Sequence, residues 1–235
     1  MKKLQLILIL SLACFLLIPV STTYAKGTQV LVPDTVKDRH SKYTAKYESG
    51  TRRVCTAILI SSTAAVTARH CGGTQRATRA GTIYPGASGR SMPFGYMNIR
   101  DYIPHPEYDI AVIKGLLRDQ SKAYQYYIRP FTTQVTGYTD EQLEGFKDSE
   151  VYSYGYPFRE GVFRQYRSDG MIKFYSKKHL LLVTDVPALK GQSGSGVFKK
   201  DGEFIGIIIG SRKDGEANVL PFTEDIADWI NENAN

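Results

Sequence analysis

Residues 189–199 read LKGQSGSGVFK, a stretch that sets Ser193 in a glycine-rich loop just before an apolar segment. A serine hydroxyl is a poor nucleophile until a histidine accepts its proton and a carboxylate fixes the tautomer of that histidine. Both partners occur upstream, since His70 lies in VTARHC at 66–71 and Asp109 lies in YDIAVI at 108–113. The order His, Asp, Ser along the chain is one of the known arrangements of a catalytic triad.

Taken together, these motifs resemble those of the trypsin/chymotrypsin-like serine peptidases, most closely the bacterial branch with the glutamyl endopeptidases and exfoliative toxins. TARHC is similar to the family's TAAHC, the Asp-Ile-Ala segment also matches, and GQSGSG is similar to the branch's GNSGS. VLVP at 30–33 resembles the start of the mature enzymes of that branch. The resemblance covers nearly all of the chain after the first 25 residues. It implies an all-β fold of two antiparallel six-stranded β-barrels with a C-terminal helix.

The resemblance also implies a role for each residue of the motifs. Ser193 would attack a peptide carbonyl, His70 would take its proton and pass it to the leaving amine, and Asp109 would orient the imidazole. The backbone N–H groups of Gly191 and Ser193 would form the oxyanion hole. The implied activity is that of a serine endopeptidase working through an acyl-enzyme.

Two of these assignments have competitors in the sequence. Asp101 or Asp119 could be the partner of the histidine instead of Asp109, but neither is followed directly by an apolar strand. Ser195 shares the small-residue loop, but the motif match selects Ser193 as the nucleophile.

Local patterns predict a chain rich in β-strands. Residues 56–60 and 64–67 are short apolar runs joined by Ser-Ser-Thr, a hairpin that would deliver His70. Asp201-Gly202 is a strong hairpin turn signal before the apolar run at 204–209. The nucleophile elbow of an α/β-hydrolase requires Gly-x-Ser-x-Gly, and the serine at 195 in place of glycine argues against that fold.

The C-terminal tail is the one segment with a helical pattern. Thr223 can cap a helix, and two acidic residues follow it where they suit the positive end of the helix dipole. Ile226, Trp229 and Ile230 recur at helical spacing.

The N-terminus has the features of a secretory signal peptide over residues 1–25. Two lysines precede an apolar run, and a small residue at Ala25 marks a cleavage point. The competing interpretation is an uncleaved membrane anchor, since a run of about 17 residues is at the lower limit of what spans a bilayer. A lipid anchor at Cys14 is disfavoured, because the apolar run continues beyond it. We therefore predict a secreted, extracellular protein.

The expected organisation of the exported part is a short propeptide at 26–29, an N-terminal barrel at 30–125 and a C-terminal barrel with its helix at 126–235. The junction is expected within the polar, tyrosine-rich stretch 118–133. In the resembled family a freshly cut N-terminus can insert and order the oxyanion loop, which suggests a zymogen activated by cleavage before Val30. Alternatively, Lys26 is already the mature start.

Two cysteines, Cys55 and Cys71, are left after removal of the signal peptide. An even pair in an exported chain indicates a disulfide, and this one would close a loop that ends beside His70. A pair of buried free thiols is the alternative. A metal site is disfavoured because the histidines are scattered and the ligands do not cluster.

The residues expected at the specificity pocket differ from those of the glutamyl endopeptidases. Those enzymes have a histidine fifteen residues after the nucleophile and a threonine or serine five residues before it, positions that are Ile208 and Ala188 here. Pro187 stands where trypsin-like enzymes have an aspartate. An apolar wall cannot hydrogen-bond a carboxylate, so we predict a small or apolar residue before the scissile bond. Lys190 and Ser211 keep glutamate preference as an alternative.

Charge and composition restrict the partners. The chain has 42% hydrophobic residues and a formal net charge of +7, which falls to about +5 without the two lysines of the leader. Basic and acidic residues are interspersed, so nucleic-acid binding is a poor interpretation, whereas contact with an anionic cell surface stays open. The sequence gives no reason to require a metal or an organic cofactor, and we expect a monomer that acts on protein or peptide substrates.

A second function class uses the same fold. An exported binding or adhesion factor could have a silent triad, or an enzyme could act on one narrow protein target. The intact His70, Asp109 and Ser193 favour catalysis over a vestigial site.

Overall fold

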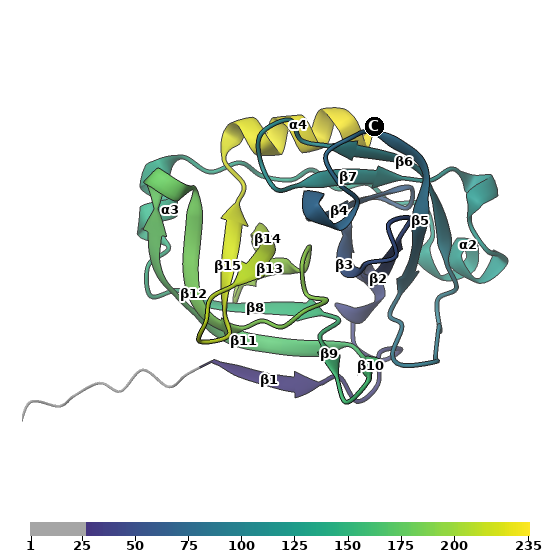
Figure 1. The fold of residues 1–235 in the computed structure, drawn as a ribbon, viewed down its shortest axis with the longest axis horizontal. Coiled ribbons are helices and arrows are strands. Elements are labelled where there is room, and N and C mark those ends of the chain that lie inside the picture. The colour runs from purple at the N-terminus through teal and green to yellow at the C-terminus, as the bar shows by residue number, and fades with distance from the viewer. Residues whose placement is uncertain (1–26) are drawn as a thin grey trace, which may run out of the picture.

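The computed structural model describes residues 27–235, so the expected signal peptide lies outside the described residues. Two antiparallel six-stranded barrels lie side by side, with a C-terminal helix across one end (Figure 1), and the predicted fold class is confirmed. Within residues 27–235 no helix has the length and apolar character needed to cross a membrane.

The first barrel is closed, and its strands lie in the order β2-β3-β4-β7-β6-β5. Short apolar runs such as Ala64–Thr67 form its strands because both of their faces are covered by the core. The bounds are β2 Thr44–Ser49, β3 Val54–Leu59, β4 Ala64–Thr67, β5 Ala77–Pro85, β6 Met97–Pro104 and β7 Ala111–Lys114.

The second barrel closes through the pairing of β11 with β8, and its strands lie in the order β11-β12-β15-β14-β13-β8. The Asp201-Gly202 turn joins β13 to β14, as its sequence predicts. The bounds are β8 Glu150–Gly155, β11 Tyr166–Ser176, β12 Leu181–Pro187, β13 Gly196–Lys199, β14 Phe204–Ser211 and β15 Glu216–Pro221.

The remaining elements are short strands, helices and 3-10 turns between and around the barrels. β9 and β10 form a small hairpin that projects from the second barrel (Figure 1). The bounds are β1 Thr28–Leu31, β9 Phe158–Arg159, β10 Val162–Phe163, α2 Lys122–Ile128, α3 Asp140–Gly145, α4 Glu224–Ala234, η1 Ser41–Tyr43, η2 Arg69–Cys71, η3 Leu117–Asp119 and η4 Lys177–His179.

The chain ends do not follow the expected division into 30–125 and 126–235. β1 pairs with β11 of the second barrel, although the expected division gives residues 30 and 31 to the first. α4 packs on β4 and β7 of the first barrel, where its buried Ile226 and Ile230 share a core cluster with Val66. The expected boundary itself falls inside α2. Each end therefore ties one barrel to the other.

Candidate active site

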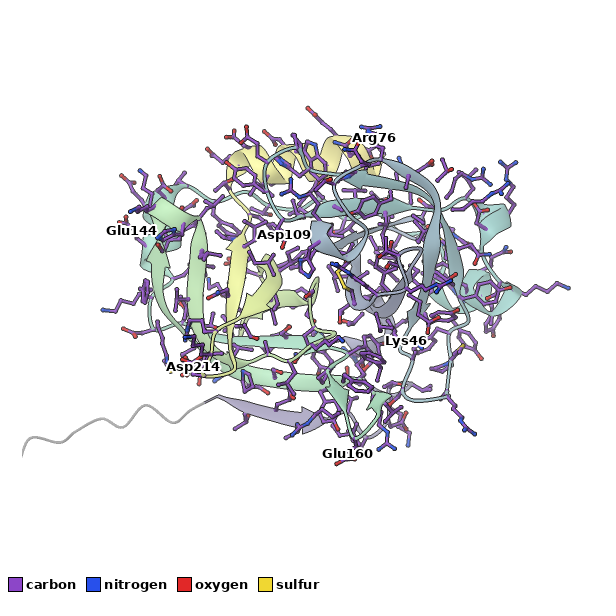
Figure 2. The ribbon with its side chains drawn as sticks, in the orientation of Figure 1. Lys46, Arg76, Asp109, Glu144, Glu160 and Asp214 are labelled. Atoms are coloured by element: carbon purple, nitrogen blue, oxygen red, sulfur yellow. A yellow bond between two sulfur atoms is a disulfide. The ribbon has the colours of Figure 1, made fainter. Side chains whose placement is uncertain are left out.

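His70 and Asp109 come together because the strands that carry them are neighbours. His70 lies on η2 just after β4, Asp109 lies just before β7, and Thr67 of β4 pairs with Ala111 of β7. The His70 Nδ1 atom is 2.7 Å from Asp109 Oδ2, and the His70 backbone N–H donates to Asp109 Oδ1 at 2.8 Å. Asp109 lies near the middle of the molecule, between the barrels (Figure 2).

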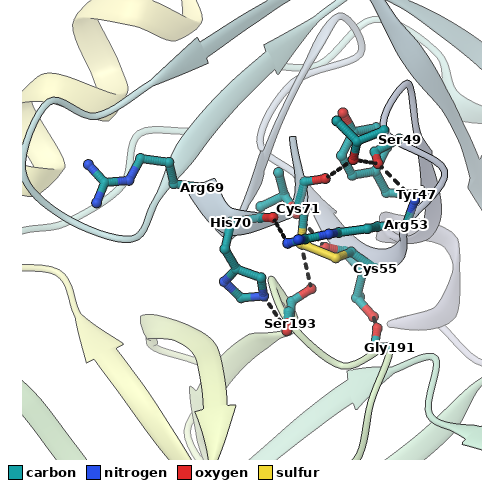
Figure 3. Close-up of a disulfide and its surroundings, with 12 residues drawn as sticks. Tyr47, Ser49, Arg53, Cys55, Arg69, His70, Cys71, Gly191 and Ser193 are labelled. Carbon is teal, nitrogen blue, oxygen red and sulfur yellow. Dashed lines mark hydrogen bonds between the residues drawn. A yellow bond between two sulfur atoms is a disulfide. The ribbon is translucent and has the colours of Figure 1, made fainter. Parts of the chain in front are cut away.

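Ser193 reaches the same point from the second barrel. Its Oγ atom is 2.9 Å from His70 Nε2, a contact drawn as a dashed line in Figure 3. The structure thus brings His70, Asp109 and Ser193 together in the spatial order that the triad chemistry requires.

Thr56 of β3 fastens the serine loop to the first barrel. Its N–H donates to the carbonyl oxygen of Ser193 at 2.9 Å, and its Oγ1–H donates to the carbonyl oxygen of Gly191 at 2.8 Å. Gly194 has φ +88°, and a Cβ there would lie 2.1 Å from the Thr56 carbonyl oxygen, so only glycine fits this close approach. Thr56 could not be predicted from the sequence, because its contact spans 135 residues and no local pattern marks it.

The electrostatics of the site favour the protonation states that a triad needs. Burial by itself raises the pKa of Asp109. Hydrogen bonds from the ring and the backbone of His70, together with the positive charge of Arg69, outweigh this effect and bring the pKa of Asp109 below 3.8. An ionised carboxylate only accepts, so Nδ1 of His70 carries the proton. Nε2 is then free to accept the hydroxyl proton of Ser193.

The competing aspartates lie elsewhere. Asp119 accepts two hydrogen bonds from the guanidinium of Arg100, both at 3.1 Å. Asp101 lies within β6, opposite Lys114 of β7. Ser195, the competing candidate for the nucleophile, is fully buried, and its hydroxyl has no hydrogen-bond partner within residues 27–235.

Two peptide planes orient the backbone N–H groups of Gly191 and Ser193. The carbonyl oxygen of Lys190 accepts from Phe158 N at 2.8 Å, and that of Gln192 accepts from Ser195 N at 2.9 Å. In a trans peptide the N–H points away from the C=O, so each contact directs the following N–H to the opposite side. Neither the Gly191 nor the Ser193 N–H donates to an acceptor within the described chain, which suits a pair of oxyanion donors.

Cys55 and Cys71 form a disulfide, which confirms the predicted bond. It links β3, which carries Thr56, to η2, which carries His70 (Figure 3). One cluster of potential metal ligands occurs within residues 27–235, and it consists of these two cysteines and His70. Its sulfur atoms are bonded to each other, so this donor set does not fit a metal ion.

A cleft of about 520 Å³ opens beside Ser193 on the side of the disulfide. Cationic and aromatic side chains surround it, with Arg53 also donating to the carbonyl oxygen of His70. The lining residues are Arg52, Arg53, Val54, Cys55, His70, Phe158, Phe163, Lys190, Gly191 and Ser193.

The five residues predicted for the specificity pocket are spread over the second barrel. Ala188 and Ile208 are buried in one hydrophobic cluster of that barrel. Pro187 ends β12, and the exposed Ser211 ends β14. Of the five, only Lys190 lines the cleft beside Ser193.

Comparison with known proteins shows which family the chain matches and which solved structures share its fold. The family model described as the trypsin-like peptidase domain matches residues 55–207. A solved structure of a Glu endopeptidase in complex with MPD is similar, with a TM-score of 0.71 and 19% identity over 90% of this chain and 98% of that one. Neuropsin, a serine protease expressed in the limbic system of mouse brain, has a TM-score of 0.61 and 16% identity over 83% and 95% of the two chains. No curated protein sequence matches this chain.

Proposed function

The chain belongs to the trypsin-like serine peptidase family, and on this premise we propose that it is a secreted serine endopeptidase that uses His70, Asp109 and Ser193. One observation carries the proposal, namely the continuous line of contacts from Asp109 Oδ2 through the His70 ring to Ser193 Oγ, with distances of 2.7 and 2.9 Å.

In the proposed reaction Ser193 Oγ attacks the carbonyl carbon of a peptide bond while His70 Nε2 takes its proton. The oxyanion that forms accepts hydrogen bonds from the N–H groups of Gly191 and Ser193. His70 then protonates the leaving amine, and the C–N bond breaks to give an acyl-enzyme. Water, deprotonated by the same histidine, hydrolyses the ester and restores the serine hydroxyl.

We propose a small or apolar residue before the scissile bond. The support is the identity of the residues at the two positions that bind the substrate carboxylate in the resembled enzymes, which are Ala188 and Ile208 here, since neither side chain can pair with a carboxylate. Both side chains lie in the core of the second barrel and outside the cleft beside Ser193. Burying an unpaired carboxylate costs several kcal/mol. The similarity to a Glu endopeptidase, at 19% identity, concerns the fold and does not transfer its substrate.

A panel of peptides that differ only at this residue tests the preference. The proposal predicts the highest kcat/KM for alanine, valine or leucine, with Ser193→Ala as the inactive control. Glutamate cleaved best, by about tenfold or more, would instead support the glutamyl endopeptidase alternative that Lys190 at the cleft keeps open.

We propose export through a cleaved signal peptide at 1–25 and action on extracellular proteins as a monomer without a cofactor. The Cys55–Cys71 disulfide supports this location, because such bonds persist in oxidising compartments. Sequencing the N-terminus of protein recovered from the culture medium tests it, and an intact Met1 would contradict cleavage.

The assembled triad and the two free oxyanion donors also support catalysis over the alternative of a silent binding factor. An enzyme restricted to one protein target would show the same geometry. It would differ from a broad peptidase in leaving the peptide panel uncut while its serine stays reactive.

A further inference from the structure

We propose that Gln29 is a positioning residue that holds the serine loop in its active geometry, so that the active form retains this residue. The inference rests on the proposed function and concerns the regulation of the same site. Its basis is β1, the short strand at the edge of the second barrel (Figure 1), which pairs Gln29 with Ser168 of β11.

Within β1, Gln29 is the residue whose side chain turns inward. The other three residues, Thr28, Val30 and Leu31, are exposed, whereas Gln29 is half-buried. Its amide nitrogen lies 3.0 Å from Oε1 of Gln192, the residue directly before Ser193. The same nitrogen lies 2.9 Å from Ser168 Oγ and 3.3 Å from the Pro187 carbonyl oxygen.

A hydrogen bond from Arg159 sets the orientation of the Gln29 amide. Its oxygen accepts a hydrogen bond from Arg159 Nη1 at 3.2 Å, so the nitrogen faces the loop. A glutamate would present a second acceptor to Gln192 Oε1 in place of a donor. Glutamate, which has the same shape as glutamine, therefore cannot make the same contact.

Gln192 is fully buried and closes the loop that carries Gly191. Its Oε1 accepts from Leu189 N at 2.9 Å, and its own N–H donates to the Leu189 carbonyl oxygen at 3.1 Å. These two bonds fold residues 189–192 into a compact turn that contains one oxyanion donor and adjoins the other. Gln29 ties this turn to the edge strand, and a small displacement of oxyanion donors lowers the rate strongly.

This arrangement bears on where the mature chain begins. The resemblance of residues 30–33 to a mature N-terminus suggests cleavage before Val30, with the new terminus ordering the loop. In the structure Val30 is 55% exposed and pairs through its backbone with Arg167, whereas the contact with the loop comes from Gln29. Cleavage before Val30 would remove that contact, so we infer that trimming at this bond lowers activity.

The test compares four proteins that begin at Lys26: the wild type, Gln29→Ala, Gln29→Glu and, as a matched control on the same strand, Val30→Ala. A fifth protein has the wild-type sequence and begins at Val30. We expect both Gln29 variants and the shortened protein to lose about tenfold to a hundredfold in kcat on the best peptide of the panel, with KM changed less than about threefold. Val30→Ala should match the wild type.

A readout that does not need activity accompanies the kinetics. Hydrogen exchange of the backbone N–H groups of Gln192 and Ser195, followed by NMR, reports the opening of the turn in folded protein. We expect exchange about tenfold faster in the two Gln29 variants than in Val30→Ala. This measurement stands even if the wild type cuts no peptide, so a failure of the proposed function remains distinct from a failure of this inference.

Two results would overturn the inference. One is unchanged exchange at Gln192 and Ser195 when Gln29 is replaced. The other is a protein beginning at Val30 that is as active as, or more active than, the protein beginning at Lys26.

Discussion

Removal of the Cys55–Cys71 disulfide should destabilise the protein while leaving its triad assembled. The bond joins β3 to η2, two segments that each contribute to the active site. Other contacts also position these segments, since the His70 N–H donates to Asp109 and the Thr56 N–H donates to Ser193. We therefore expect the Cys55→Ala/Cys71→Ala variant to fold at 25 °C and to have a reactive serine.

The size of the effect follows from the length of the closed loop. The cysteines are 16 residues apart, and a cross-link over such a loop lowers the entropy of the unfolded chain by about 10 cal/mol/K. At 25 °C this corresponds to about 3 kcal/mol of unfolding free energy. The loss is a large fraction of the roughly 5–15 kcal/mol by which typical domains are stable.

Urea unfolding followed by tryptophan fluorescence measures the difference, since Trp229 lies on α4 against the first barrel. Comparing the wild type with and without a reductant gives a second estimate of the free energy that the disulfide contributes, and this estimate involves no substitution. A loss below about 1 kcal/mol in both comparisons would refute the loop-entropy argument. A folded variant whose serine no longer reacts would refute the claim that the other contacts suffice.

Three further predictions concern single residues. Asp109→Asn should lower kcat about ten-thousandfold at neutral pH with little change in KM, because the imidazole loses its orienting anion; a loss below about tenfold, measured by peptide cleavage, would speak against its role. Burial lowers the pKa of His105 below 6.5, so the unfolded chain binds more protons and the unfolding free energy should fall as the pH drops through 6.5. Urea titrations at about pH 7.5 and about pH 5.5 should show a smaller fall in His105→Gln, and equal falls would exclude this cause. Thr56→Val should cost about 1–3 kcal/mol by leaving the Gly191 carbonyl oxygen without its donor, whereas Thr56→Ser should keep most of that stability in the same assay.

The motifs were sufficient to select the residues that meet at the site, because each stands in a short, distinctive context. The apolar strand after Asp109 distinguishes it from Asp119, which the structure pairs with Arg100. Local structure was also predictable where a residue type has a strong preference for one turn or cap. Asp201-Gly202 forms the predicted turn, and the Oγ of Thr223 accepts from Ile226 N at the start of α4.

Long-range pairings could not be predicted from the sequence. Nothing in Thr28–Leu31 indicates that this strand joins β11 of the second barrel, since its partner lies about 140 residues away. The contact of Gln29 with Gln192 depends on that pairing. Likewise, the apolar face of α4 predicts a buried helix but does not say which barrel it covers.

The proposed function requires that Ser193 is a nucleophile activated by His70. Incubation of the exported, N-terminally sequenced protein with a fluorophosphonate probe, followed by mass spectrometry of its peptides, tests this directly. We expect the probe to modify Ser193 in the wild type and to be absent from both Ser193→Ala and His70→Ala. Folded wild type that stays unlabelled, or labelling that persists in Ser193→Ala, would contradict it.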